Sequence, residues 1–176
     1  LQRSAKQTAL VQRLSRLQPE PIHFMPLLQG KPWHYRRRAR LSVLLDSKNR
    51  KLNIGLRRKN SQQIIPIEHC LVLEQPLNDL LPKLTALFEQ WSMPQQLGPI
   101  ELVAAANGIA LLLRHVKNIA ETDRTLLLRF AEQQQLMLFV QEHDSIEHWY
   151  GEQPYYRLGD DLTLQFDIRD FIQINA

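Results

Sequence analysis

The stretch YRRRARLSVLLD at residues 35–46 determines how the first half of this 176-residue chain folds. Apolar side chains recur there at every second position, which predicts a strand with one buried face. That face carries Ala39, Leu41, Val43 and Leu45, and Arg37 interrupts it near its start. Residues 46–50 are turn formers, and residues 51–58 alternate in the same way. We therefore expect a β-hairpin, extended by a third strand at residues 63–67.

Beyond this hairpin, the hydrophobic pattern predicts an α+β fold of antiparallel hairpins with helices packed on one side. The other expected elements are an amphipathic helix at 1–17, a helix at 76–91, strands at 100–106 and 109–116, a helix at 122–135, a buried strand at 136–140, and short strands at 155–158 and 162–167. We expect Asn107 and Gly108 to form a type I′ turn, and Thr122 to cap its helix. The polar run containing His143 and His148 is expected to be a solvated loop.

Composition excludes several classes of protein. With 44% hydrophobic and 23% charged residues, the chain is typical of a globular domain and not of a disordered one. No stretch approaches the ~20 apolar residues of a membrane span. A single cysteine, Cys70, excludes an intramolecular disulfide and fits a reducing cytoplasm. Neither a glycine-rich phosphate loop nor a histidine or cysteine metal motif is present in the sequence.

The charges are segregated along the chain. Residues 1–59 hold 15 Lys and Arg against two acids, whereas residues 60–176 hold 7 against 16. A basic first third of this kind indicates a surface for a polyanion, with RNA or DNA as the leading candidates. The alternative is an electropositive face that only aids solubility.

Arginines on the strand at 35–46 are the strongest candidates for this contact. Arg36, Arg38 and Arg40 are spaced to project to one side, about 6.5–7 Å apart, which is near the phosphate repeat of an extended nucleic-acid strand. Guanidinium groups bind phosphate at two points, which Lys cannot do. Further cations at the end of the partner strand would extend the site: Arg57, Arg58 and Lys59. The alternative is a solvated face whose arginine stems cover apolar surface.

Two further features come from single residues. Cys70 has no second thiol nearby in sequence, so composition alone predicts a small buried core residue. At the end of the chain, Phe171, Gln173 and Asn175 alternate with isoleucines, so an extended segment would place them on one face. Amide side chains both donate and accept hydrogen bonds, which suits reading a base edge.

Four stretches in the same order resemble the RNA uracil-C5-methyltransferases, above all the bacterial enzymes that act on 23S ribosomal RNA. They are YRRRARLSV (35–43), NIGLRRKNS (53–61), IEHCLVLEQPLNDLLP (67–82) and RDFIQINA (169–176). The resemblance implies a central piece of a longer enzyme that methylates C5 of a uracil with S-adenosylmethionine. Residues 1–20 would be a linker helix after a cysteine cluster, 21–168 the central RNA-binding domain, and 169–176 the start of a Rossmann-like methyltransferase domain.

The resemblance also implies roles for single residues. Gln173 would contact S-adenosylmethionine, and Phe171 and Asn175 would shape the pocket for cofactor and uracil. Cys70 would be the fourth ligand of a [4Fe-4S] cluster whose other three cysteines this chain lacks. No catalytic residue is expected within the chain, so we expect the chain alone to hold no cluster and to be inactive.

Two alternatives to an rRNA methyltransferase stay open at this point. One is a stand-alone RNA-binding module without catalysis, and the other is a tRNA uracil-C5-methyltransferase. On the main interpretation we expect a cytoplasmic protein whose partner is ribosomal RNA, with no membrane association and no obligate protein partner.

Overall fold

The computed structural model describes residues 2–18, 20–46 and 51–174 and divides into two units, Leu1–Lys31 and Pro32–Ala176. The first unit contains helix α1 (Gln2–Ser15), which confirms the helix expected there. None of its residues is buried, and Leu10 and Leu14 are exposed. Among the described residues, no helix is long and apolar enough to cross a membrane.

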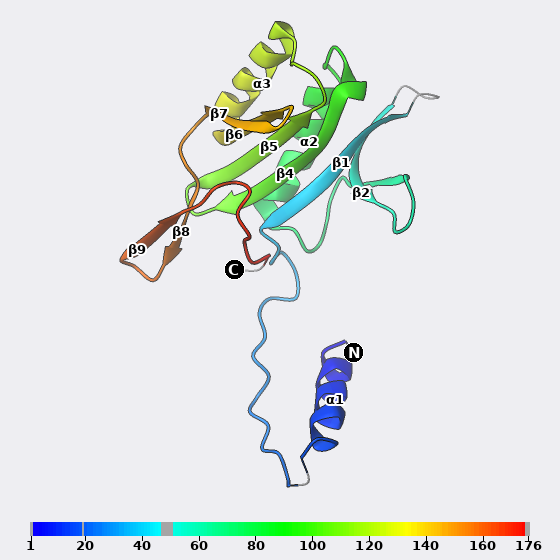
Figure 1. The fold of residues 1–176 in the computed structure, drawn as a ribbon, viewed down its shortest axis with the longest axis vertical. Coiled ribbons are helices and arrows are strands. Elements are labelled where there is room, and N and C mark those ends of the chain that lie inside the picture. The colour runs from blue at the N-terminus through cyan, green and yellow to red at the C-terminus, as the bar shows by residue number, and fades with distance from the viewer. Residues whose placement is uncertain (1, 19, 47–50, 175–176) are drawn as a thin grey trace. The chain divides into compact units, whose positions relative to one another are not determined.

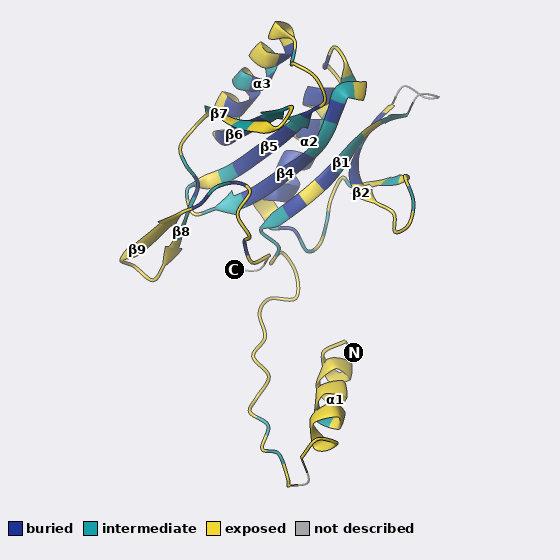
Figure 2. Cartoon of the chain, viewed as in Figure 1, coloured by how far each residue is buried: buried dark blue, intermediate teal, exposed yellow. Residues whose placement is uncertain are grey.

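The second unit is built on a seven-stranded sheet with the order β3-β2-β1-β4-β5-β6-β7 (Figure 1). Its strands are β1 (Arg38–Asp46), β2 (Lys51–Arg57), β3 (Ile64–Pro66), β4 (Leu97–Ala105), β5 (Gly108–His115), β6 (Leu136–Glu142) and β7 (Ser145–Tyr150). Neighbouring strands are antiparallel except β5 and β6, which helix α3 (Glu121–Gln133) connects as a parallel pair. Strands β8 (Tyr155–Leu158) and β9 (Leu162–Gln165) form a separate, largely exposed hairpin (Figure 2). The predicted α+β class is confirmed.

One face of the sheet is covered by α3 and by α2 (Gln75–Phe88), which has a proline in its first turn, as suits a helix N-terminus. The leucines of α2 recur at helical spacing, and Leu77, Leu81 and Leu84 are fully buried against the sheet. A short 3-10 turn (Pro94–Gln96) then leads into β4. The helices therefore pack on one side, as the sequence predicted (Figure 1).

The opposite face of the sheet is covered in part by the C-terminal stretch, drawn in red in Figure 1. Phe166, Ile168 and Ile172 pack there against apolar side chains of β4, β5 and β6. Because alternate residues of a strand point to opposite faces, β1 places Arg38 and Arg40 on this same face. The C-terminal stretch and the arginines of β1 are thus brought to one side of the sheet.

The predicted reversal between β4 and β5 differs from the structure. Ala105 pairs with Gly108, so the two turn residues are Ala106 and Asn107. Neither has the positive φ that a type I′ turn requires; Gly108, which follows them, has a φ of 133°. The type I′ turn is therefore wrong. Asn107 is instead held from outside the hairpin: its Nδ2 donates to the Gln153 carbonyl at 3.0 Å, and its Oδ1 accepts from the Tyr155 amide at 3.2 Å.

The start of α3 and the edge of the sheet also differ from expectation. Ala120 is the N-cap residue of α3, and no side chain caps it, so the predicted Thr122 cap is wrong. His148 lies on the edge strand β7, where a loop was expected, and its ring stacks on Phe139 with centroids 4.4 Å apart. The partly buried apolar residues of β7, Ile146 and Trp149, are three positions apart, so the strand lacks the period-two alternation that marks a strand with one solvated face.

Gly55 is required for the close approach of β2 and β3. A Cβ atom at this position would lie 1.9 Å from the carbonyl oxygen of Ile65. We expect Gly55→Ala to lower the free energy of unfolding by about 1–3 kcal/mol, because β3 must move away. Chemical unfolding checks this, with Gly30→Ala as the control, since nothing lies within 4 Å of a Cβ there. Equal stability of the two variants would contradict the packing described.

Candidate nucleic-acid interface

The three predicted arginines occupy different environments. Arg38 donates from Nη2 to Glu101 Oε2 at 2.7 Å and to the Ile168 carbonyl at 3.2 Å, and from Nη1 to the Asp170 carbonyl at 2.6 Å. Arg36 is half-buried, and its Nε donates to the carbonyl of Arg38 at 2.9 Å. The Arg40 side chain is 64% exposed and has its Nε 4.0 Å from Glu101 Oε1. Arg40 is therefore the most exposed of the three, and its long contact with Glu101 is the weakest of their internal contacts, so it can reach a ligand most readily.

The cations of β2 extend the same face. Ser42 of β1 is paired with Gly55 of β2, and Arg40 and Arg57 each lie two residues from that pair. Because side chains alternate along both strands, Arg40 and Arg57 project to the same side. Arg58 follows with its Nη1 3.2 Å from Gln63 Oε1, and Lys59 is exposed beyond it.

A buried carboxylate organises the arginines, and its one signal in the sequence is a charge inside an otherwise apolar strand. Glu101 lies on β4 and accepts at 2.7 Å from Arg38 and at 2.7 Å from Arg114 Nη1, a residue of β5. Burial alone would raise the pKa of Glu101, but the hydrogen bonds from Arg38 and Arg114 outweigh it and lower this pKa below its usual range. With Arg40 nearby, three guanidinium groups surround one carboxylate. This part of the face is consequently positive although its central residue is acidic.

The C-terminal stretch shows the predicted alternation as far as Gln173, whereas Ile174, expected on the buried side, is 39% exposed. Phe171 is 86% exposed and Gln173 is exposed, whereas Ile172 between them is 6% exposed and belongs to the second core. Asn175 lies outside the described residues. Phe171 and Gln173 are therefore presented on the surface of the sheet face that also carries Arg40.

Cys70 is half-buried in a loop that α2 holds in place. Its amide donates to Asn78 Oδ1 at 2.8 Å, and Asn78 Nδ2 donates to the carbonyls of Cys70 and Leu73, both at 3.0 Å. In the part of the chain that the structure describes, no group of three or more His, Cys, Asp or Glu could hold a metal. An iron–sulfur cluster takes four thiolates in its common form. Cys70 can therefore supply one of the four ligands of such a site.

Asn78 is the residue whose removal should free the Cys70 loop. We expect Asn78→Ala to lower stability by about 1–3 kcal/mol, because buried backbone groups lose their partners, and to speed modification of the Cys70 thiol. Thermal unfolding and the rate of thiol labelling check this. Gln75→Ala, an exposed change on the same helix, is the control. Unchanged labelling in Asn78→Ala would contradict the role of the amide.

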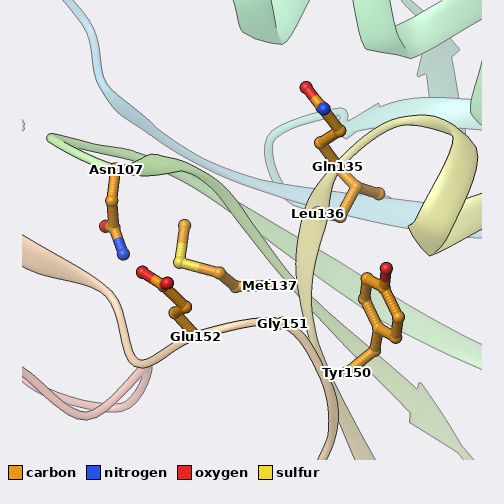
Figure 3. A pocket seen from close by; sticks show the side chains of 7 residues that line it. All are labelled: Asn107, Gln135, Leu136, Met137, Tyr150, Gly151 and Glu152. Atoms are coloured by element: carbon orange, nitrogen blue, oxygen red, sulfur yellow. The ribbon is translucent and has the colours of Figure 1, made fainter.

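An open pocket of about 190 Å³ lies on the same sheet, away from these residues (Figure 3). Its lining comes from the β4–β5 turn, the start of β6 and the end of β7, and it comprises Asn107, Gln135, Leu136, Met137, Tyr150, Gly151 and Glu152. None of the predicted site residues lines it. Both polar atoms of the Asn107 side chain are already bonded within the fold, so we assign the pocket no part in the interface.

Solved structures show that the fold has precedent. The tRNA (uracil-54, C5)-methyltransferase of Pyrococcus abyssi, solved with S-adenosyl-L-homocysteine, matches 93% of this chain with a TM-score of 0.65. The match covers 43% of that chain at 18% sequence identity, so it shows the fold alone.

Sequence comparison gives much closer relatives, although no protein-family model matches the chain. The 23S rRNA (uracil(1939)-C(5))-methyltransferase RlmD of Pasteurella multocida is 59% identical over 176 residues, and that of Photobacterium profundum is 49% identical over 143. The chain spans about 40% of the length of the Pasteurella protein. The resemblance to the RNA uracil-C5-methyltransferases that the motifs indicated is therefore confirmed, and all 176 residues correspond to a portion of the RlmD proteins of this family.

Proposed function

We propose that this chain is the RNA-positioning part of an enzyme that transfers a methyl group from S-adenosylmethionine to C5 of a uracil in 23S ribosomal RNA. The observation that carries the proposal is the 59% identity to an RlmD protein over the whole chain. An exposed basic face, made of Arg40, Arg57, Arg58 and Lys59, supports it. The same identity favours rRNA over tRNA as the substrate and an enzyme over a stand-alone binding module. Since ribosomal RNA is its proposed partner, we place the protein in the cytoplasm.

The RNA would lie across the ends of β1 and β2. Arg40, Arg57 and Lys59 are exposed there and would bind phosphate directly, with Arg58 beside them. Arg36 and Arg38 would act mainly through their charge, because Arg38 donates its hydrogen bonds inside the fold. Electrostatic contacts to phosphate position a nucleic acid without reading its sequence. The choice of uracil therefore falls to other residues.

Exposed residues of the C-terminal stretch would face the reacting groups. S-adenosylmethionine supplies the methyl group when bound, and Gln173 would contact it through a side-chain amide that can both donate and accept. Phe171 and Asn175 would line the pocket for the target base, Phe171 with an exposed ring suited to stacking. In the whole enzyme we assign residues 1–20 to a linker helix, 21–168 to the RNA-binding domain and 169–176 to the start of the methyltransferase domain.

Cys70 would complete a [4Fe-4S] cluster with three cysteines from outside this chain. Its support in this structure is a half-buried thiol on a loop whose backbone is fixed by Asn78. Iron content and visible absorption of the full-length protein, with and without Cys70→Ala, test the assignment. Loss of iron in the variant supports it, and retention of a full cluster contradicts it.

The proposed activity is tested by methyl transfer. Full-length protein is incubated with tritiated S-adenosylmethionine and 23S rRNA from a strain that lacks uracil-C5 methylation. We expect one methyl group on C5 of one uracil, located by mass spectrometry of nuclease fragments. Transfer to tRNA in preference to 23S rRNA, or no transfer to either, would refute the proposal.

A further inference from the structure

Arg37 contacts the C-terminal stretch through its backbone and its Nε, and contacts Tyr156 of β8 through its flat guanidinium face. Its amide donates to the Ile174 carbonyl at 2.8 Å, and its Nε donates to the Gln173 carbonyl at 2.9 Å. The guanidinium carbon lies 4.3 Å from the centroid of the Tyr156 ring, which stacks in turn on Phe166. The Arg37 carbonyl accepts from the amide of Ala104 at 2.8 Å, so the residue is fixed to β4.

The adjacent Arg38 holds the same stretch further back, at the carbonyls of Ile168 and Asp170. Arg37 and Arg38 thus donate hydrogen bonds to four carbonyl oxygens between residues 168 and 174. The stretch is not part of any strand that the structure describes, and its apolar anchors are Ile168 and Ile172. Beyond Ile172, Arg37 holds the backbone around Gln173 through its two hydrogen bonds to the carbonyls of Gln173 and Ile174.

We propose that Arg37 is a positioning residue for Gln173. By fixing the carbonyls of Gln173 and Ile174 to the sheet, it sets the direction in which the exposed Gln173 amide projects, and thereby the affinity for S-adenosylmethionine. This inference rests on the cofactor contact that the proposed function gives to Gln173. It also accounts for an arginine at a position where the sequence pattern would have an apolar residue, because Arg37 precedes β1 (Arg38–Asp46) and contacts the C-terminal stretch.

The geometry requires arginine and not simply a positive charge. The guanidinium is planar, so Nε can donate in the plane while the flat face stacks on Tyr156. The ammonium of lysine is a compact group that cannot do both. Arg37→Lys therefore keeps the charge seen by RNA and loses at least one of the two side-chain interactions.

The test measures two affinities of the full-length protein separately. Calorimetry gives the Kd for S-adenosylmethionine without RNA, and filter binding gives the Kd for an unmodified 23S rRNA fragment. We expect Arg37→Lys to weaken cofactor binding about tenfold, a loss of about 1.4 kcal/mol, and to leave RNA affinity within about twofold. Gln173→Ala should weaken cofactor binding as well. The double variant should bind no worse than Gln173→Ala alone, because coupled residues are not additive.

Tyr156→Phe is the matched control, because it keeps the ring under Arg37 and removes a buried hydroxyl that has no hydrogen-bond partner among the described residues. It should leave the cofactor Kd unchanged. Unchanged cofactor affinity in Arg37→Lys, beside a loss in Gln173→Ala, overturns the positioning role and leaves the proposed function standing. A loss of RNA affinity alone would make Arg37 a phosphate contact and overturn the inference. No loss in Gln173→Ala overturns both the cofactor contact and the inference built on it.

Discussion

Replacing Glu101 with glutamine will lower the free energy of unfolding by about 3 kcal/mol at pH 7, the lower end of the range for breaking a buried ion pair from one side. The carboxylate is the shared partner of Arg38 and Arg114, and its side chain is 7% exposed. The two arginine side chains are 21% and 25% exposed, so water compensates part of their loss. Urea unfolding of the wild type and Glu101→Gln measures the difference. Asp167→Asn, which breaks an exposed pair with Arg169, is the control and should cost less than about 1 kcal/mol.

The same pair makes stability depend on acid pH. The pKa of Glu101 is lower in the folded protein than its ordinary value of 4.5, so its contribution is fully present above pH 4.5 and is lost as the pH falls through the folded pKa. The stability difference between wild type and Glu101→Gln should therefore shrink below pH 4.5. A difference that stays constant into strong acid would contradict the ionised state of Glu101.

Removing the exposed cations of the basic face will weaken RNA binding on the order of a hundredfold at 0.1 M salt. The variant replaces Arg40, Arg57, Arg58 and Lys59 with glutamine in the full-length protein. For each phosphate that the variant no longer binds, the slope of log affinity against log salt should fall by about 0.7–0.9, so the whole change is about 3. Filter binding of an unmodified 23S rRNA fragment at several salt concentrations measures both quantities.

The matched control removes cations from the helical face. Lys83 on α2 and Arg129 on α3 lie on helices that pack on that side, and changing both to glutamine should leave the slope as in the wild type. The control removes two cations and the basic-face variant removes four, so the two are compared per cation removed. A decrease in slope per cation that is equal in the two sets would show that the effect follows net charge and not the position of the basic face.

The sequence predicted the local elements well because their signals are local. Alternation at 35–46 indicated β1, and leucine spacing indicated α2. The partner of Arg38 could not be predicted, because Glu101 lies 63 residues away and meets β1 only through the register in which Arg40 pairs with Glu101. A charged residue inside an otherwise apolar strand was the one available signal.

Two of the remaining errors have the same cause. The type I′ turn failed because Asn107 bonds to a segment nearly 50 residues later, and strand β7 was missed because its partner, not its own sequence, sets its pairing. The face presented by Phe171 and Gln173 was predictable from alternation. That Arg37 holds this stretch was not, although its place in an apolar pattern marked it as unusual.

Locating the RNA on the protein tests the proposed role of the basic face. Full-length protein is crosslinked by ultraviolet light to an unmodified 23S rRNA fragment, and the crosslinked peptides are identified by mass spectrometry. We predict crosslinks within residues 33–40 and 57–59, where exposed Trp33 and Tyr35 lie beside the basic residues. Crosslinks confined to α2 and α3, with none in these two segments, would contradict the placement of RNA on this face.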